Sequence, residues 1–76
     1  MDRIVVRPDI HFGKPCVAGT RIQVKDVLEL VEKGLSFEAV IRDHYPDLTL
    51  EDVKACVHYA LEIVRSEEVH ISSTAA

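Results

Sequence analysis

Residues 49–68 read TLEDVKACVHYALEIVRSEE and lie in the longest stretch of the chain without glycine or proline. Thr49 is a suitable helix cap, and the carboxylate of Asp52, three positions later, can bond back to it. The apolar side chains recur at steps of three and four residues: Leu50, Val53, Val57, Ala60, Leu61 and Val64. This period predicts an amphipathic helix over about residues 50–68, the longest helix of the chain.

The apolar arc of this helix is wider than a small core needs. Cys56, Tyr59 and Ile63 extend it beyond the main stripe. An arc of this width is typical of a helix that has one contact inside its own domain and another with a second chain. We therefore expect a homodimer with these three residues in its interface.

Two shorter helices are predicted before the long one. Apolar residues recur at helical spacing from residue 24, and Gly34 is well placed to end a first helix over about residues 24–33. Ser36 can cap a second helix over about residues 37–44, which Pro46 stops because the residue before a proline disfavours the α conformation. Two short helices, a turn and a longer capped helix form a unit of helix-turn-helix type.

Residues 3–22 form a different kind of segment. Arg3 to Arg7 is rich in β-branched residues and ends at Pro8, which predicts a short edge strand. Glycines and a proline follow, so we expect fixed turns with brief extended pieces at residues 16–17 and 21–22. The chain is expected to be a single, mainly α domain over residues 1–76, with a short N-terminal β-arm, three helices and a frayed tail at residues 70–76.

Length and composition exclude several classes of protein. A chain of 76 residues has room for one domain and buries only roughly 60% of the surface that it exposes when unfolded, so a partner would add stability. No apolar run approaches the ~20 residues of a membrane span, and the N-terminus lacks the apolar core of a signal peptide. We expect a cytoplasmic protein without a membrane partner, in which Cys16 and Cys56 are free thiols.

The net charge of −4 is unevenly distributed. Residues 1–25 carry five basic and two acidic side chains, a net charge of +3. Residues 26–76 carry four basic and eleven acidic ones, a net charge of −7. Such asymmetry is typical of a chain with two kinds of partner.

DNA is one partner that fits the basic segment. In helix-turn-helix units the first residues of the helix after the turn enter the major groove, but here Glu51 and Asp52 would meet phosphates unfavourably. The candidate DNA-binding residues are therefore mostly basic and lie on the arm and the long helix: Arg7, Lys14, Thr20, Arg21, Lys25, Thr49, Lys54 and His58. The alternative is a packing bundle in which the acidic start of the helix is only a cap.

Catalysis and cofactor binding find little support in the residues. Lys14 follows Gly13 in the wrong order for a phosphate-binding P-loop, and Pro15 removes a backbone N–H that such a loop needs. Cys56 and His58 lie two apart on a helix and point to different faces, and no four ligands converge on a zinc ion. We expect no enzymatic activity, no metal and no cofactor.

Two motifs are specific in their order and separation. The first is the turn Gly-Lys-Pro at residues 13–15 followed by Gly-Thr-Arg-Ile at residues 19–22, and the second is YPDLTLEDV at residues 45–53. Together they resemble the signatures of the prokaryotic family called domain of unknown function 433, over residues 3 to about 64. Where many members carry a pair of small residues before the first glycine, this chain has His11 and Phe12.

The resemblance implies a homeodomain-like, three-helix helix-turn-helix fold. It also implies an antitoxin of VapB type, a small cytoplasmic dimer that neutralises a PIN-like ribonuclease toxin and binds its own promoter. Because such a nuclease has a basic RNA groove, we expect the toxin-binding residues near the end of the long helix, at Glu62, Glu67 and Glu68. The alternative is a small dimeric protein-interaction domain without a DNA role.

Overall fold

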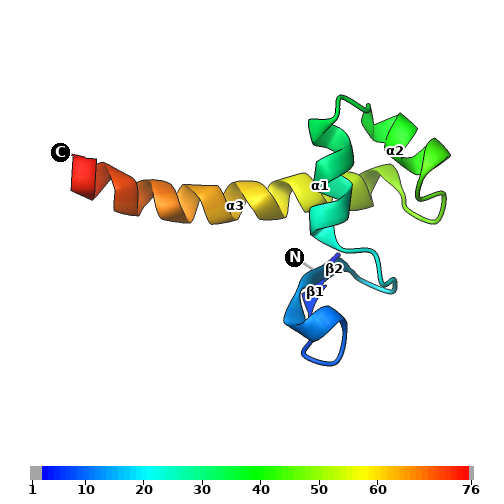
Figure 1. Ribbon diagram of the computed structural model, residues 1–76, viewed down its shortest axis with the longest axis horizontal. Helices are drawn as coiled ribbons and strands as arrows, with labels where there is room; N and C mark the ends of the chain where they lie inside the picture. The colour runs from blue at the N-terminus through cyan, green and yellow to red at the C-terminus, as the bar shows by residue number, and fades with distance from the viewer. Residues whose placement is uncertain (1–2, 76) are drawn as a thin grey trace.

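The structure is a computed structural model that describes residues 3–75, with side chains described for residues 3–66. Its elements follow in the order β1 (Ile4–Val6), η1 (His11–Gly13), β2 (Pro15–Val17), α1 (Val24–Glu32), α2 (Phe37–Asp43) and α3 (Leu50–Ala75). Figure 1 shows α1 crossing the first half of α3, α2 beside the start of α3, and the two strands at the foot of α1. The predicted three helices and short β-arm are confirmed.

The arm is an antiparallel hairpin in which Ile4 pairs with Val17 and Val6 pairs with Pro15. Residues 21–22, which the sequence predicted as an extended piece, are not a strand; the neighbouring Gln23 instead forms a single bridge with Cys16. This bridge holds the start of α1 against β2.

The first two helices begin and end at the predicted signals. Gly34 adopts a φ of 100°, and the N–H of Leu35 bonds to the carbonyl of Leu30 at 3.2 Å, so the chain leaves α1 through a left-handed glycine cap. The hydroxyl of Ser36 accepts the N–H of Ala39 at 3.1 Å and caps α2.

The long helix α3 begins with the predicted capping box. The Asp52 N–H donates to the Thr49 hydroxyl at 3.2 Å, and the Thr49 N–H donates to the Asp52 carboxylate at 2.9 Å. The helix continues to Ala75, further than the predicted end near residue 68, so the predicted tail is helical as far as Ala75, and Ala76 lies outside the described residues. The apolar pattern stops earlier, but no glycine or proline interrupts the backbone hydrogen bonds there.

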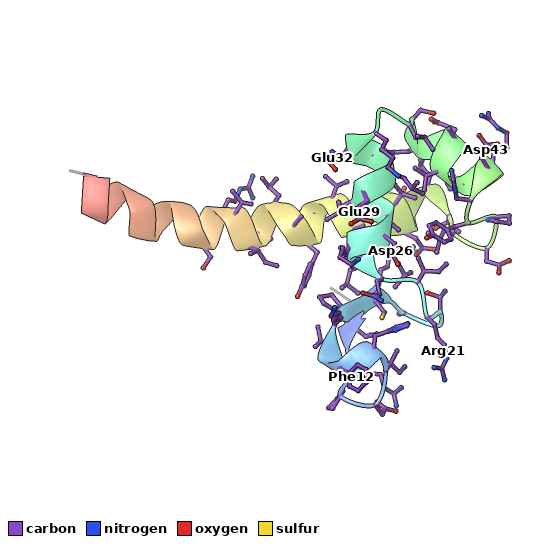
Figure 2. All side chains as sticks on the ribbon, in the orientation of Figure 1. Phe12, Arg21, Asp26, Glu29, Glu32 and Asp43 are labelled. Atoms are coloured by element: carbon purple, nitrogen blue, oxygen red, sulfur yellow. The ribbon has the colours of Figure 1, made fainter. Side chains whose placement is uncertain are left out.

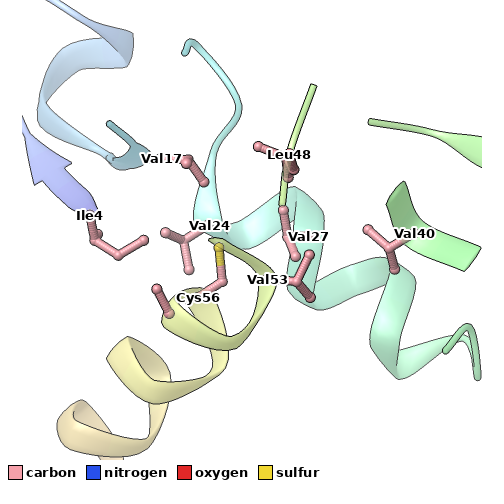
Figure 3. Close-up of a cluster of buried hydrophobic side chains, with 9 residues drawn as sticks. Ile4, Val17, Val24, Val27, Val40, Leu48, Val53 and Cys56 are labelled. Carbon is pink, nitrogen blue, oxygen red and sulfur yellow. The ribbon is translucent and has the colours of Figure 1, made fainter. Parts of the chain in front are cut away.

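The core is small, rich in valine and shared by every strand and α-helix (Figure 3). Its buried side chains are Ile4, Val17, Val24, Val27, Val40, Leu48, Val53, Ala55 and Cys56. Because the arm places Ile4 and Val17 in the same cluster as Val53 of α3, burial of apolar surface holds the arm against the helices.

Candidate functional site

The tip of the β-arm has an unusual backbone. Between β1 and β2 the chain turns through η1, where His11 (φ 50°), Phe12 (φ 56°) and Gly13 (φ 83°) all adopt left-handed conformations. The His11 Nε2 donates to the carbonyl of Arg21 at 2.8 Å, and the Gly13 N–H donates to the carbonyl of Ile10 at 3.1 Å. These bonds fasten the tip to the segment that leads into α1.

A surface cavity of about 430 Å³ lies beside this turn. Its lining residues are Val5, Arg7, Ile10, Gly19, Thr20 and Arg21. The cavity therefore brings two guanidinium-bearing side chains to one concave surface. Guanidinium groups bind phosphate and carboxylate oxygens through two parallel hydrogen bonds, so the cavity is suited to an anion.

The polar residues of the cavity differ in what they already bind. Arg7 donates from Nε and Nη2 to the Asp9 carboxylate at 3.3 and 3.2 Å, but both side chains are exposed, and such a pair contributes little to stability. Thr20 donates to the carbonyl of Val17 at 2.9 Å and accepts from the N–H of Ile22 at 3.0 Å, so its hydroxyl fixes the turn. Arg21 is exposed and has no ion-pair partner among the residues whose side chains are described.

Asp52 connects the arm to α3. Its Oδ1 accepts from Arg3 Nη1 at 2.9 Å while its Oδ2 accepts the Thr49 N–H. Burial by itself would raise the pKa of this carboxyl, but hydrogen bonds from Thr49 and Arg3 outweigh burial and lower the pKa below its ordinary value. The charge of Asp52 is thus compensated within the chain, which leaves Glu51 as the exposed carboxylate at this end of the helix.

Several of the other DNA-binding candidates already interact with residues of the same chain. Lys25 Nζ lies 3.5 Å from the Asp26 carboxylate, and His58 Nε2 lies 3.8 Å from that of Glu62. Thr49 serves as the cap of α3. Three candidates are exposed and form no ion pair within the part of the chain whose side chains are described: Lys14, Arg21 and Lys54. The structure brings Arg7, Thr20 and Arg21 together and leaves Lys54 on a separate element.

A second charged surface runs along α1. Asp26, Glu29 and Glu32 are spaced three residues apart, and Figure 2 shows them following one another along the helix, away from Arg21 on the arm. Burial, together with the charges of Asp26 and Glu29, raises the pKa of the nearby Tyr45 hydroxyl. We call these three carboxylates the acidic stripe. The acidic stripe was not predicted from the sequence, although three carboxylates at steps of three residues within a predicted helix indicate that they lie near one another on its surface.

The predicted partner-binding acid Glu62 has a basic partner, as do two acids of the stripe: Lys25 Nζ lies 3.5 Å from the Asp26 carboxylate and 3.8 Å from that of Glu29. Glu62 accepts from Arg65 Nη1 at 2.9 Å and lies close to His58, so its charge is partly neutralised within the helix. The side chains of Glu67 and Glu68 lie outside the described residues.

The three dimer candidates occupy different environments. Cys56 is fully buried in the core of the single chain, which leaves its side chain unavailable to a second copy. Tyr59 is partly buried against the core, whereas Ile63 is 45% exposed. Beyond the body of the molecule α3 projects with no other element beside it (Figure 1), and Leu61 and Val64 are exposed there as well.

The two cysteines are free thiols, and both are buried. Burial raises the pKa of Cys56 to about 11, with a further contribution from the charge of Asp52, so the thiol is protonated at neutral pH. Within the part of the chain that the structure describes, no three histidine, cysteine or carboxylate side chains gather to hold a metal ion. None of the described helices combines the length and apolarity that a membrane crossing requires.

Comparison with known proteins places this geometry in a family. The family model described as "Protein of unknown function (DUF433)" matches residues 4–60. The chain is also similar to a crystal structure of a DUF433 member protein from Anabaena variabilis ATCC 29413, with a TM-score of 0.76 and 25% sequence identity. That match covers 95% of this chain and 70% of the other. No curated protein matches the chain.

Proposed function

This chain belongs to the DUF433 family, and from that premise we propose that it is an antitoxin-like module with two binding surfaces. The arm binds operator DNA in the promoter of its own gene, and the acidic stripe binds and neutralises a PIN-like ribonuclease toxin. The observation that supports this proposal is the separation of charge. Arg7 and Arg21 share a cavity on the arm, while the carboxylates of Asp26, Glu29 and Glu32 line α1.

On DNA, the arm supplies contacts to phosphates. The cavity offers the guanidinium of Arg21, which has no competing carboxylate among the described side chains, and Lys14 adds a free cation on the same hairpin loop. Phosphate contacts of this kind set the position of a protein on a duplex. In this proposal α2 and α3 act as a homeodomain-like helix-turn-helix pair, and Lys54 contacts the groove edge from the second turn of α3.

The DNA role is tested by measuring affinity for a labelled promoter duplex of about 30 bp, enough for two half-sites, over a series of salt concentrations. The logarithm of the affinity should fall linearly with the logarithm of the salt concentration, by about 0.9 for each phosphate contact. Arg21→Glu should weaken binding at least tenfold and flatten this slope. The matched control is Lys33→Glu, the same change of charge at an exposed lysine that caps α1 at the end away from the arm.

Two results would contradict this assignment. Absence of binding by the wild-type chain at low salt would exclude the operator role altogether. Equal affinities of the Arg21→Glu and Lys33→Glu variants would show that the contacts reflect overall charge and not the arm.

For the toxin, the acidic stripe provides the complementary surface. Three carboxylates on one helix present a negative potential that fits a basic nucleic-acid groove and would block RNA from entering it. Glu62, to which Arg65 already donates, is a second candidate, and the side chains of the predicted Glu67 and Glu68 lie outside the described residues.

The neighbouring gene tests this half of the proposal. If it encodes a PIN-like protein, co-expression of the two should abolish that protein's ribonuclease activity. The double variant Glu29→Lys, Glu32→Lys should lose this inhibition, while Glu38→Lys, an exposed acid on α2, should retain it. An unimpaired double variant would move the toxin surface away from α1.

A homodimer completes the proposal. Val53, Ala60 and Val64 lie on one face of α3, and this face is buried at Val53 but exposed at Val64. A second copy packed along the projecting half of α3 would cover Leu61 and Ile63. The same exposed residues favour the second candidate function, a dimeric interaction domain without DNA binding, which the salt series separates from the first.

A further inference from the structure

Phe12 is fully exposed at the tip of the arm. Its side chain is 99% exposed, whereas the other exposed large apolar residues whose side chains are described range from 37% to 55%. Figure 2 shows the ring at the end of the arm, apart from the helices. Nothing in the fold of the single chain therefore requires an aromatic ring at this position.

The backbone conformation at Phe12 is also not explained by folding of the single chain. A non-glycine residue with a φ of 56° is in a sparsely populated conformation that costs stability, and His11 beside it has a φ of 50°. The strain is maintained by the bond from His11 to Arg21 and by the bond from the Lys14 N–H to the His11 carbonyl at 3.2 Å. Glycine would suit position 12 better on conformational grounds. The chain instead places an aromatic ring in solvent on a strained backbone, and packing within the single chain does not explain this loss of stability.

The surroundings of the ring indicate what it meets. Lys14 follows two residues later, and the His11 bond joins the turn to the backbone carbonyl of Arg21, so the arm carries the ring together with two cations that form no ion pair among the described side chains. Cations combined with an exposed ring are the chemistry of nucleic-acid binding, in which the cations contact phosphates and the ring contacts bases.

We propose that Phe12 is a wedge that inserts between adjacent base pairs from the minor groove and bends the operator. This inference rests on the proposed DNA function and adds its mode. Arg21 and Lys14 contact phosphates beside the inserted ring, and the rigid left-handed turn keeps the ring from folding back onto the arm. Apolar side chains inserted in this way partially unstack a base step and kink the duplex.

Phe12→Gly separates function from folding. Glycine adopts a positive φ readily, so this variant should fold at least as well as the wild type and show a higher midpoint in urea unfolding. It should bind the labelled promoter duplex at least tenfold more weakly, with an unchanged salt slope because the phosphate contacts remain. A duplex labelled at both ends for energy transfer should shorten with the wild type and with Phe12→Leu, but not with Phe12→Gly. Val6→Ala, which removes another exposed apolar side chain of the arm, is the matched control.

The outcomes are distinguishable. Equal affinity and equal bending by the wild type and Phe12→Gly would overturn the wedge, and a loss of binding in Arg21→Glu would then still support the operator role. No binding of DNA by the wild type would overturn both. If Phe12→Gly binds and bends DNA normally but no longer inhibits the ribonuclease, the ring is a protein anchor and the wedge is again overturned.

Discussion

Cys56 illustrates how strongly the small core controls the chemistry of a single residue. Its sequence position beside Val53 and Val57 left open whether the side chain faces the core or a partner. In the structure it has no exposed surface, and burial raises its pKa to about 11. The thiol is therefore a small apolar side chain at neutral pH, with low reactivity toward alkylating reagents.

This raised pKa predicts an alkaline loss of stability. A free cysteine titrates near pH 8.5, so the unfolded chain gains thiolate above that pH while the folded chain keeps its proton up to about 11. The contribution is fully present below pH 8.5 and is lost as the pH rises through 11. Because a tenfold difference in proton affinity between the folded and unfolded chains is worth about 1.4 kcal/mol, the free energy of unfolding should fall by ~2–3 kcal/mol over this range.

Urea unfolding at pH 7 and pH 10.5 checks this expectation. Because lysines and tyrosines also titrate, the measured quantity is the difference between the wild type and Cys56→Ala at each pH. Cys56→Ala should be less stable at pH 7, since it leaves a cavity, and the two proteins should converge at pH 10.5. A difference that stays constant with pH would show that the Cys56 thiol does not resist ionisation.

At the scale of elements, Asp52 caps α3 and at the same time ties β1 to it through Arg3. Asp52→Asn weakens both contacts and should lower the free energy of unfolding at pH 7 by about 1–2 kcal/mol. Because its pKa is lowered on folding, the contribution of Asp52 is present above the unfolded-state pKa of about 3.9 and is lost as the pH falls through the folded value.

The two proteins should therefore differ at pH 7, and the difference should shrink as the pH falls below the unfolded-state pKa of about 3.9, as measured by urea unfolding. Glu51→Gln is the control, because it removes a neighbouring exposed carboxylate without touching the cap or the arm. If Glu51→Gln loses as much stability as Asp52→Asn, the loss would come from the interaction of a carboxylate with the helix dipole and not from the cap or the contact with Arg3.

The ends of helices could be predicted from the sequence where residues close to the end determine them. Gly34, Ser36 and the pair Thr49 and Asp52 each act within a few residues, and the structure confirms the caps and the helices that they delimit. The C-terminal end of α3 could not be predicted from the sequence, because an apolar pattern indicates which residues pack against a core and not how far the helical backbone continues.

The candidate site could be predicted only in part, because it depends on contacts between distant segments. The residue type of Arg21 made it a candidate, but its cavity with Arg7 arises only when β1 and the turn after β2 come together. The positive φ of Phe12 has no sequence signal, since phenylalanine ordinarily avoids that conformation. The burial of Cys56 in the core of the single chain could also not be predicted, because its helix is apolar over a wide arc.

The whole molecule is unevenly stabilised. Its body has a small valine core, and the arm joins this core through Ile4 and Val17, yet the second half of α3 projects beyond every other element (Figure 1). An isolated helical segment in water is marginal, so the projecting half gains stability from packing against another surface. A second copy of the same helix offers an apolar face of the same pattern, so in the proposed homodimer folding and association would be linked processes.

Linked folding predicts a Tm that depends on protein concentration. Tenfold dilution of the wild type in the micromolar range should lower the Tm by several degrees, because dilution favours the separated, unfolded chains over the folded dimer by mass action. Val64→Lys places a charge in the proposed interface and should give a lower Tm that no longer changes on dilution. Val6→Lys is the matched control, since Val6 is 55% exposed on the arm and Val64 is 53% exposed on α3. A wild-type Tm that is unchanged on dilution, together with a monomer mass in sedimentation equilibrium, would exclude the dimer and leave the apolar face of α3 for a different protein.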